Sequence, residues 1–399
     1  MSDQQVPYDS KAAWRTVAGG FLGMFVVFGI MYSFGTFFVA IAAEFDAGSA
    51  RTALMFSLVT FATYILGAAT GRAVDRVGPR ALLLLGAVAL GGGLVATSQA
   101  ADLGLIYLTY GAGLGLAVAC GYVPLLTTVS GWFQRQRAMA LGLAVSGIGL
   151  GTLVVAPVAG VLIDRYGWRT AMLLLGVVGA GLLLVSATLV SPPPPSAEVA
   201  PGPLRSRLRS PAFRWLYVSN MLFTSSVFFT LAFLAPYASA GGASTAAAGT
   251  LVGVIGISSV VGRLALGGTA VRFGALRVFE ACFLLVSLSM LVWIFAGSYA
   301  WLVGFAVLFG IGYGGFVALS PAVLAEKFGL EGLGGIMGLL YTAAGISGLL
   351  APPLAGLLID RTDSYTVAIV AVMVAGIAGL ALLLPLPRLP TMPREEAGG

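Results

Sequence analysis

The sequence predicts an all-α membrane protein with twelve transmembrane helices in two six-helix bundles. Three observations lead to this fold class. Hydrophobic residues make up 59% of the 399 residues and charged residues only 9%, whereas soluble domains carry about 25% charged residues. Long apolar runs follow one another along the chain, and its two halves repeat each other. So few charges cannot cover a water-facing surface, which excludes a soluble enzyme, a secreted disulfide scaffold and a disordered chain.

Each predicted helix is an apolar run between charges and turn residues. A helix needs about 20 such residues to cross the hydrocarbon layer of a membrane. The runs are continuous rather than alternating, which favours helices over a β-barrel. The twelve runs are 14–43, 52–71, 80–100, 103–130, 138–163, 169–191, 214–240, 245–270, 277–296, 299–324, 334–359 and 365–386.

A proline-rich and basic stretch divides the chain in the middle. Four successive prolines begin at Pro192, and three arginines follow up to Arg209. Proline cannot continue a helix, and a basic run stays out of lipid. We therefore expect a cytoplasmic N-terminus at 1–13, an N-terminal bundle at 14–191, a cytoplasmic linker at 192–212, a C-terminal bundle at 213–387 and a cytoplasmic tail at 388–399.

The lysines and arginines predict the orientation. If both termini are cytoplasmic, sixteen of them lie on the cytoplasmic side and four on the other, and Arg263 lies inside a span. Cytoplasmic loops of membrane proteins carry such a bias. It also accounts for the net charge of +6 without nucleic acid. We expect a multi-pass protein of the cell (inner or plasma) membrane, in contact with the lipid bilayer.

The sequence gives no sign of a catalytic site, cofactor or metal. It has no histidine, and Cys120 and Cys282 lie in separate apolar runs. The glycine-rich segments Gly111–Gly115 and Gly310–Gly314 lack the lysine of a phosphate-binding loop, so we interpret them as helix-packing glycines. We expect a non-enzyme with no cofactor, no nucleic acid and no soluble protein partner.

The internal repeat has one offset throughout. The segment PVAGVLIDR from Pro157 to Arg165 matches PLAGLLIDR from Pro353 to Arg361, an offset of 196 residues. The segment that begins at Gly71 matches the one at Gly267 with the same offset. This predicts two similar bundles related by an axis along the membrane normal, each with an even number of spans.

The repeated segment that begins at Gly71 reads GRAVDRVGPR up to Arg80 in its first copy. This copy resembles the loop motif between helices 2 and 3 of the major facilitator superfamily. The resemblance covers nearly the whole chain and implies that fold. Asp75 can accept hydrogen bonds from a helix N-terminus or a basic residue across the bundle interface, which would close a cytoplasmic gate. A tight loop with solvated charges is the alternative. The gating candidates are Gly71, Asp75, Arg76, Gly78, Arg80, Arg135 and Arg137.

A second segment, WFQRQRAMALGLAVSG from Trp132 to Gly147, resembles the helix-5 signature of monocarboxylate transporters. That signature combines aromatic residues, a basic cluster, and then alanine and glycine. The signature that these transporters carry before helix 1 is reduced here to Asp9 and Trp14. The resemblance therefore points to this branch of the superfamily or to a distant relative of it.

Arg263 lies well inside the predicted span 245–270. A central arginine costs roughly 2.5–3.5 kcal/mol on insertion scales, and such a residue is functional by default. Arg272 lies nine residues further on, about 13 Å along a helix, which is beyond the reach of a snorkelling side chain. Guanidinium pairs with carboxylate through two parallel hydrogen bonds. We therefore expect Arg263 to bind a substrate carboxylate.

The resemblance implies the same role, because monocarboxylate transporters carry a substrate-binding arginine on helix 8 at the position of Arg263. Many members have a proton-coupling aspartate four residues earlier, where this chain has Ser259. Related oxalate/formate exchangers add a lysine on helix 11, whereas the span 334–359 has no basic residue. One buried cation suits a monocarboxylate better than a dicarboxylate.

Further substrate-site candidates are aromatic or polar residues inside the spans. Buried tyrosine hydroxyls need partners, which a substrate could supply; core packing is the alternative for each. Tyr122 is favoured because its helix belongs to the opposite half from Arg263. The full set is Arg263, Tyr122, Tyr32, Tyr313, Tyr341, Ser259, Phe28 and Asn220.

The predicted function is secondary active transport of a small monocarboxylate such as lactate or pyruvate, by alternating access and with a proton as co-substrate. Moving one anion inward against 100 mV costs about 2.3 kcal/mol, and a proton carried with it makes the step electroneutral. The alternatives are a carboxylate exchanger of the oxalate/formate type, a membrane sensor without transport, and a drug exporter, which would not need a central arginine.

Overall fold

The computed structural model describes residues 8–194, 208–329 and 333–389. Within these ranges every regular element is a helix. The predicted segments 1–7, 195–207 and 390–399 of the N-terminus, linker and tail lie outside the described residues. The helices are α1 (Lys11–Tyr32), α2 (Phe34–Glu44), α3 (Ser49–Val77), α4 (Pro79–Ser98), α5 (Leu103–Gly121), α6 (Val123–Gly131), α7 (Arg137–Leu189), α9 (Pro211–Ala240), α10 (Thr245–Phe273), α11 (Ala275–Ile294), α12 (Tyr299–Phe328), α13 (Leu333–Thr362), α14 (Tyr365–Leu383) and the short 3-10 helix η1 (Leu386–Arg388).

The described residues form eleven helical stretches that are long and apolar enough to cross a membrane. The longest, α7, has 53 residues, or about 80 Å at 1.5 Å per residue, against a hydrocarbon layer of about 30 Å. Gly167 breaks it in two, with a φ of 78° that glycine adopts without steric cost. Counted as two, α7 brings the described crossings to twelve, and the predicted fold class is confirmed.

Two crossings are each built from two successive helices. The chain bends at Ser33 between α1 and α2, and at Tyr122 between α5 and α6. Ser33 Oγ donates to the Ile30 carbonyl at 2.7 Å, and Thr36 Oγ1 donates to the Ser33 carbonyl at 2.6 Å. Such side-chain bonds satisfy backbone groups that a helix break exposes where water is scarce. At the second break Pro124 has no N–H to donate.

The helix ends differ from the predicted ones in two places that have a clear cause. α1 begins at Lys11, three residues before the predicted start at 14, because Ser10 caps it: the Ala13 N–H donates to Ser10 Oγ at 3.4 Å. The predicted runs 138–163 and 169–191 meet within α7, where the bend at Gly167 takes the place of a loop.

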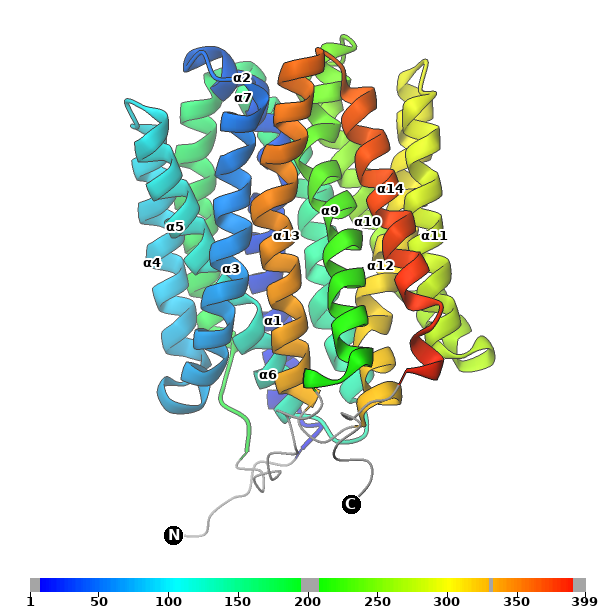
Figure 1. Cartoon of the computed structure of the whole chain (residues 1–399). Helices are drawn as coiled ribbons and strands as arrows, with labels where there is room; N and C mark the ends of the chain where they lie inside the picture. Colours follow the sequence, from blue (N-terminus) through cyan, green and yellow to red (C-terminus); the bar gives the residue numbers. More distant parts are fainter. Residues whose placement is uncertain (1–7, 195–207, 330–332, 390–399) are drawn as a thin grey trace.

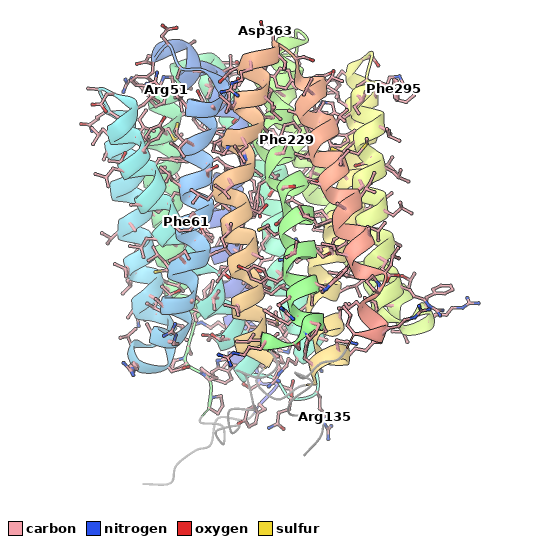
Figure 2. All side chains as sticks on the ribbon, in the orientation of Figure 1. Arg51, Phe61, Arg135, Phe229, Phe295 and Asp363 are labelled. Carbon is pink, nitrogen blue, oxygen red and sulfur yellow. The ribbon has the colours of Figure 1, made fainter. Side chains whose placement is uncertain are left out.

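The helices stand side by side with roughly parallel axes (Figure 1). The halves meet where α7 contacts α10 and where α3 contacts α13. We call the end that holds Arg135 the terminal end, and the end that holds Arg51 and Asp363 the distal end (Figure 2). The charge bias of the sequence predicts that the terminal end is cytoplasmic.

Apolar side chains cover the flanks of the bundle. Val88, Leu264 and Phe295 are 72%, 74% and 74% exposed. Figure 2 shows Arg51 at the distal end and Arg135 at the terminal end, with apolar side chains on the flanks between them. Large exposed apolar surfaces of this kind mark contact with a membrane or a partner, and their length here matches a bilayer. The chain is therefore a multi-pass membrane protein.

The contacts between the halves depend on glycine. A Cβ atom on Gly160 of α7 would lie 2.6 Å from Cα of Ala246 in α10, and one on Gly356 of α13 would lie 2.6 Å from the backbone N of Ala50 in α3. Real Cβ atoms essentially never approach other atoms closer than 3.0 Å. Glycine therefore allows these backbones to approach each other, as in other membrane helix pairs.

Candidate functional site

A cavity lies between the two halves, and most helices that border the seam contribute to its wall. It has about 650 Å³ of atom-free space, counting the part open to solvent. The space inside it that a water molecule can reach is about 50 Å³. The lining residues are Phe28, Tyr32, Tyr64, Tyr122, Ile148, Asn220, Thr224, Val227, Phe228, Arg263, Tyr313, Phe316, Val317, Ser320, Leu340, Tyr341 and Ala344.

Arg263 of α10 is the one charged residue in that lining. Its Nη1 donates to the carbonyl of Val145 in α7 at 2.7 Å, so the side chain reaches from the C-terminal half to the N-terminal half. Its Nε and Nη2 are buried and have no hydrogen-bond partner among the described residues. In a guanidinium these two nitrogens present N–H groups along one edge, which is the edge that pairs with a carboxylate.

An acidic partner for Arg263 does not occur in the part of the chain that the structure describes. The ion pair found there joins Arg169 and Glu44 at 2.7 Å, near the distal end. A buried donor without a partner costs roughly 1–3 kcal/mol, and more when the group is charged. The site therefore holds a cation whose two buried N–H donors, Nε and Nη2, are suited to an anionic ligand.

Tyrosines from both halves surround this cation. The Tyr32 and Tyr313 hydroxyls lie 3.1 Å apart and share a hydrogen bond across the seam. The Tyr122 ring packs edge-on against Phe28, with ring centres 5.0 Å apart. The Tyr341 ring lies 6.3 Å from that of Tyr122. Because these rings come from α1, α5–α6, α12 and α13, the wall of the cavity changes whenever the halves move relative to each other.

Seven of the predicted substrate-site residues line this one cavity: Arg263, Tyr122, Tyr32, Tyr313, Tyr341, Phe28 and Asn220. Ser259 does not line it. Its side chain is 2% exposed, and its Oγ donates to the Gly256 carbonyl of its own helix at 2.8 Å. A helix-packing position thus takes the place of the predicted substrate contact.

The lining also contains residues that the sequence analysis did not single out. Tyr64 of α3 is a tyrosine inside a span, so the criterion that selected the other tyrosines also applies to it. Its ring lies 6.0 Å from that of Tyr341. Thr224 and Ser320 are small polar residues that occur at many other places in the spans, so composition alone gives no signal for them.

The gating candidates lie at the terminal end. Asp75, Arg76 and Arg80 are exposed, and within the described residues Asp75 forms no ion pair. Gly78 has a φ of 80° at the turn from α3 to α4. A Cβ atom on Gly71 would lie 2.7 Å from Val123 Cγ1, so α3 and α6 are close there. Their gating role stays a prediction.

Arg135 and Arg137 belong to a second cluster at this end. The Arg137 Nε donates to the Ser130 carbonyl at 3.0 Å. The backbone N–H groups of Arg135 and Gln136 donate to the Asp9 carboxylate at 3.4 and 3.3 Å. Asp9 therefore binds the loop that leads into α7. The two segments that carry the resemblance to monocarboxylate transporters thus meet in space.

Comparison with known proteins decides the family. A sequence model of the Major Facilitator Superfamily matches residues 20–278 and 221–399. The chain belongs to the major facilitator superfamily. The prediction from the loop and helix-5 motifs is thereby confirmed, and the relatives in this superfamily are transporters rather than enzymes.

Among the relatives of this superfamily member, monocarboxylate transporter 13 of Bos taurus is 31% identical and covers 93% of this chain and 88% of its own. Monocarboxylate transporter 12 of Xenopus laevis is 29% identical, with 92% and 86% covered. A bacterial homologue of the human lysosomal transporter Spinster, solved in an inward-facing and unoccupied conformation, matches with a TM-score of 0.74 over 95% of this chain and 98% of its own. Its 14% identity supports the fold alone.

The unpaired guanidinium leads to a stability prediction. Arg263→Met replaces a buried cation with a shorter, unbranched apolar side chain, so we expect the unfolding temperature in nanodiscs to rise by about 2–5 °C. The shift that added carboxylates cause in the wild type should disappear in this variant. Arg272→Met, at the end of the same helix, is the matched control and should change neither quantity. A less stable Arg263→Met that still responds to carboxylates would contradict the assignment.

Proposed function

We propose that the protein carries small monocarboxylates such as lactate or pyruvate across the membrane by alternating access, with one proton for each anion. The observation that carries this proposal is the free edge of Arg263, formed by buried Nε and Nη2 in a cavity between the two halves. A site between two repeated bundles is where such transporters bind their substrates. The carboxylate would fill both free N–H positions at once.

The charge of the cavity supports one carboxylate on the substrate rather than two. Arg263 is its single cation, and the lining includes no acidic residue. Among the described residues of α13, the basic residue is Arg361, at the distal end. A second carboxylate would therefore be desolvated without a partner, which costs several kcal/mol.

The free energy of moving a charge across the membrane supports a proton as co-substrate. An anion moving alone would work against the membrane potential at about 2.3 kcal/mol per 100 mV. Because no carboxylate side chain lines the cavity, we propose that the proton travels close to the substrate carboxylate itself. The same observation favours the second candidate, a carboxylate exchanger, because anion exchange needs no proton carrier.

The proposal also includes the orientation of the protein in the membrane. Sixteen lysines and arginines against four support a cytoplasmic terminal end and a place in the cell membrane. The cytoplasmic gate would then include Gly71, Asp75, Arg76, Gly78 and Arg80, whose contacts form when the terminal end closes.

The test is uptake of labelled lactate and pyruvate by proteoliposomes. We expect an inward proton gradient to speed uptake several-fold, and Arg263→Ala to lower it at least tenfold, because a lone carboxylate then has no cation to bind. Arg272→Ala should transport like the wild type. Size-exclusion chromatography of each variant shows that it is folded.

Two other results would change the proposal. Rapid counterflow from preloaded vesicles without any response to the proton gradient would favour the exchanger. Undiminished uptake by Arg263→Ala, or no uptake of any carboxylate by the wild type, would reject monocarboxylate transport at this site.

A further inference from the structure

Asn220 of α9 lines the same cavity as Arg263 and is 3% exposed. Its Nδ2 donates to the backbone carbonyl of Leu340 in α13 at 3.2 Å. A carbonyl can only accept, so this bond fixes which way the amide points. The Oδ1 atom is left buried without a donor among the described residues.

Neighbouring hydroxyls of the cavity wall already donate elsewhere. Thr224 Oγ1 donates to the Asn220 backbone carbonyl at 2.8 Å, and Ser320 Oγ donates to the Phe316 carbonyl at 2.7 Å. A buried acceptor with no donor is energetically unfavourable. A ligand that donates a hydrogen bond to Asn220 Oδ1 would recover this free energy on binding.

The two groups without partners therefore indicate which chemical groups a complementary ligand carries. Arg263 offers donors for a carboxylate, and Asn220 offers an acceptor for a donor group. That donor is neutral, because the cavity has no acidic residue to balance an ammonium. Apolar side chains supply much of the remaining wall, among them Phe28, Phe228 and Phe316.

We propose that the substrate is a hydroxy monocarboxylate with an apolar remainder, and that Asn220 Oδ1 accepts a hydrogen bond from its hydroxyl group. This inference rests on the proposed monocarboxylate transport and narrows the substrate class. A keto acid would place a second acceptor against Oδ1, and an unsubstituted acid would leave Oδ1 unsatisfied. Asn220 thus selects among carboxylates that Arg263 alone would bind equally.

The experiment measures proteoliposome uptake of matched pairs: lactate with propionate, 3-hydroxybutyrate with butyrate, and 2-hydroxyisocaproate with isocaproate, with pyruvate as the keto acid. In the wild type we expect at least one hydroxy acid to be taken up at least tenfold faster than its unsubstituted partner. Asn220→Leu, of similar volume, should abolish this preference by lowering uptake of the hydroxy acid to that of its unsubstituted partner. Ser225→Ala, on the same helix but outside the cavity lining, should keep the preference.

The outcomes separate the two proposals. Equal uptake within every pair by the wild type overturns the role of Asn220 and leaves monocarboxylate transport intact. A preference that survives in Asn220→Leu also overturns it. No uptake of any acid is instead a failure of the proposed function. If Asn220→Leu misfolds, Asn220→Ala takes its place, and its hydroxy-acid preference is interpreted in the same way.

A second inference rests on separate contacts at the distal end. The Asp360 carboxylate of α13 accepts from the backbone N–H groups of Ser49 and Ala50, at 2.7 and 3.0 Å, at the start of α3. The Asp164 carboxylate of α7 accepts from the N–H of Ala246, at 3.3 Å, at the start of α10. Each contact joins one half to the other, and each places a carboxylate on a helix N-terminus, where negative charge is favoured.

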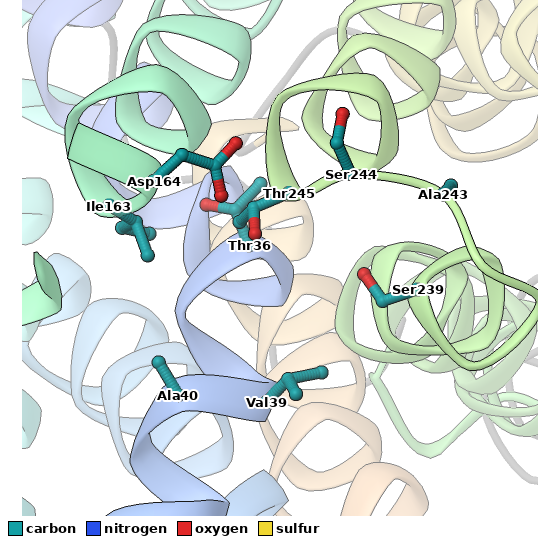
Figure 3. Close-up of a pocket in the computed structure, with 9 residues that line it drawn as sticks. All are labelled: Thr36, Val39, Ala40, Ile163, Asp164, Ser239, Ala243, Ser244 and Thr245. Atoms are coloured by element: carbon teal, nitrogen blue, oxygen red, sulfur yellow. The ribbon is translucent and has the colours of Figure 1, made fainter.

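Both contacts are made by the repeated segment of the sequence, one by each copy. Asp164 and Asp360 hold the same position in its two copies, and the glycines one turn earlier, Gly160 and Gly356, let the partner helix approach. The two contacts differ in tightness. Beside Asp164 lies a cavity with about 560 Å³ of atom-free space, counting the part open to solvent, bordered by Thr36 and other residues of α2, α7, α9 and α10 (Figure 3).

We infer that the two copies of this motif form a paired latch that closes the distal end, with Asp360 as its tighter member. When the distal end opens, both carboxylates separate from the N–H groups of the opposite half. The glycines leave the backbones free to part, because no side chains interlock at these positions.

Spin labels on Tyr166→Cys and Gly297→Cys, one in each half at the distal end, test the latch in a background without Cys120 and Cys282. We expect Asp164→Ala combined with Asp360→Ala to raise the population with long label distances at least threefold. Asp360→Ala alone should act more strongly than Asp164→Ala alone. Arg361→Ala, which removes a neighbouring charge, should leave the distribution unchanged. A double variant with the wild-type distribution overturns the inference.

Discussion

A buried guanidinium with only part of its hydrogen bonding satisfied lies at the contact between the two halves. Arg263 Nη1 donates to the Val145 carbonyl of the opposite half, and its Nε and Nη2 are buried without a partner among the described residues. The bond holds α10 against α7, while the free edge makes an empty site energetically incomplete. In the proposed transport, one side chain therefore serves both substrate binding and the contact between the halves.

Small residues and polar contacts hold the two halves together along the seam. In lipid there is no hydrophobic force that drives helices together, so packing between small residues and polar contacts must hold them. Glycines such as Gly160 and Gly356 permit backbone contact at the distal end. Polar contacts there come from carboxylates on helix N-termini, which form or break as whole units. A seam of interlocked large side chains would resist separation of the halves.

The two ends of the bundle differ in how well the repeat is kept. At the distal end both copies retain glycine and aspartate, and both form contacts between the halves. At the terminal end the second copy has Val271 where the first has Asp75, and Val271 is 92% exposed. At the terminal end the second copy thus lacks the carboxylate and keeps a charge only at Arg272, the position of Arg76, so the two ends are chemically unequal.

The number of crossings and the outlying arginine could be predicted from the sequence, because long apolar runs must cross the membrane as helices and a charge inside such a run stands out. The sequence also placed seven cavity residues in the right spans. Only the tertiary structure decided which faces meet: it turned Ser259 towards its neighbouring helices, added Tyr64 to the cavity and left Asn220 Oδ1 unpartnered. Helices that are apolar all round give no stripe from which their orientation can be read. The direction of a side chain is then fixed by packing between helices that lie far apart in the chain.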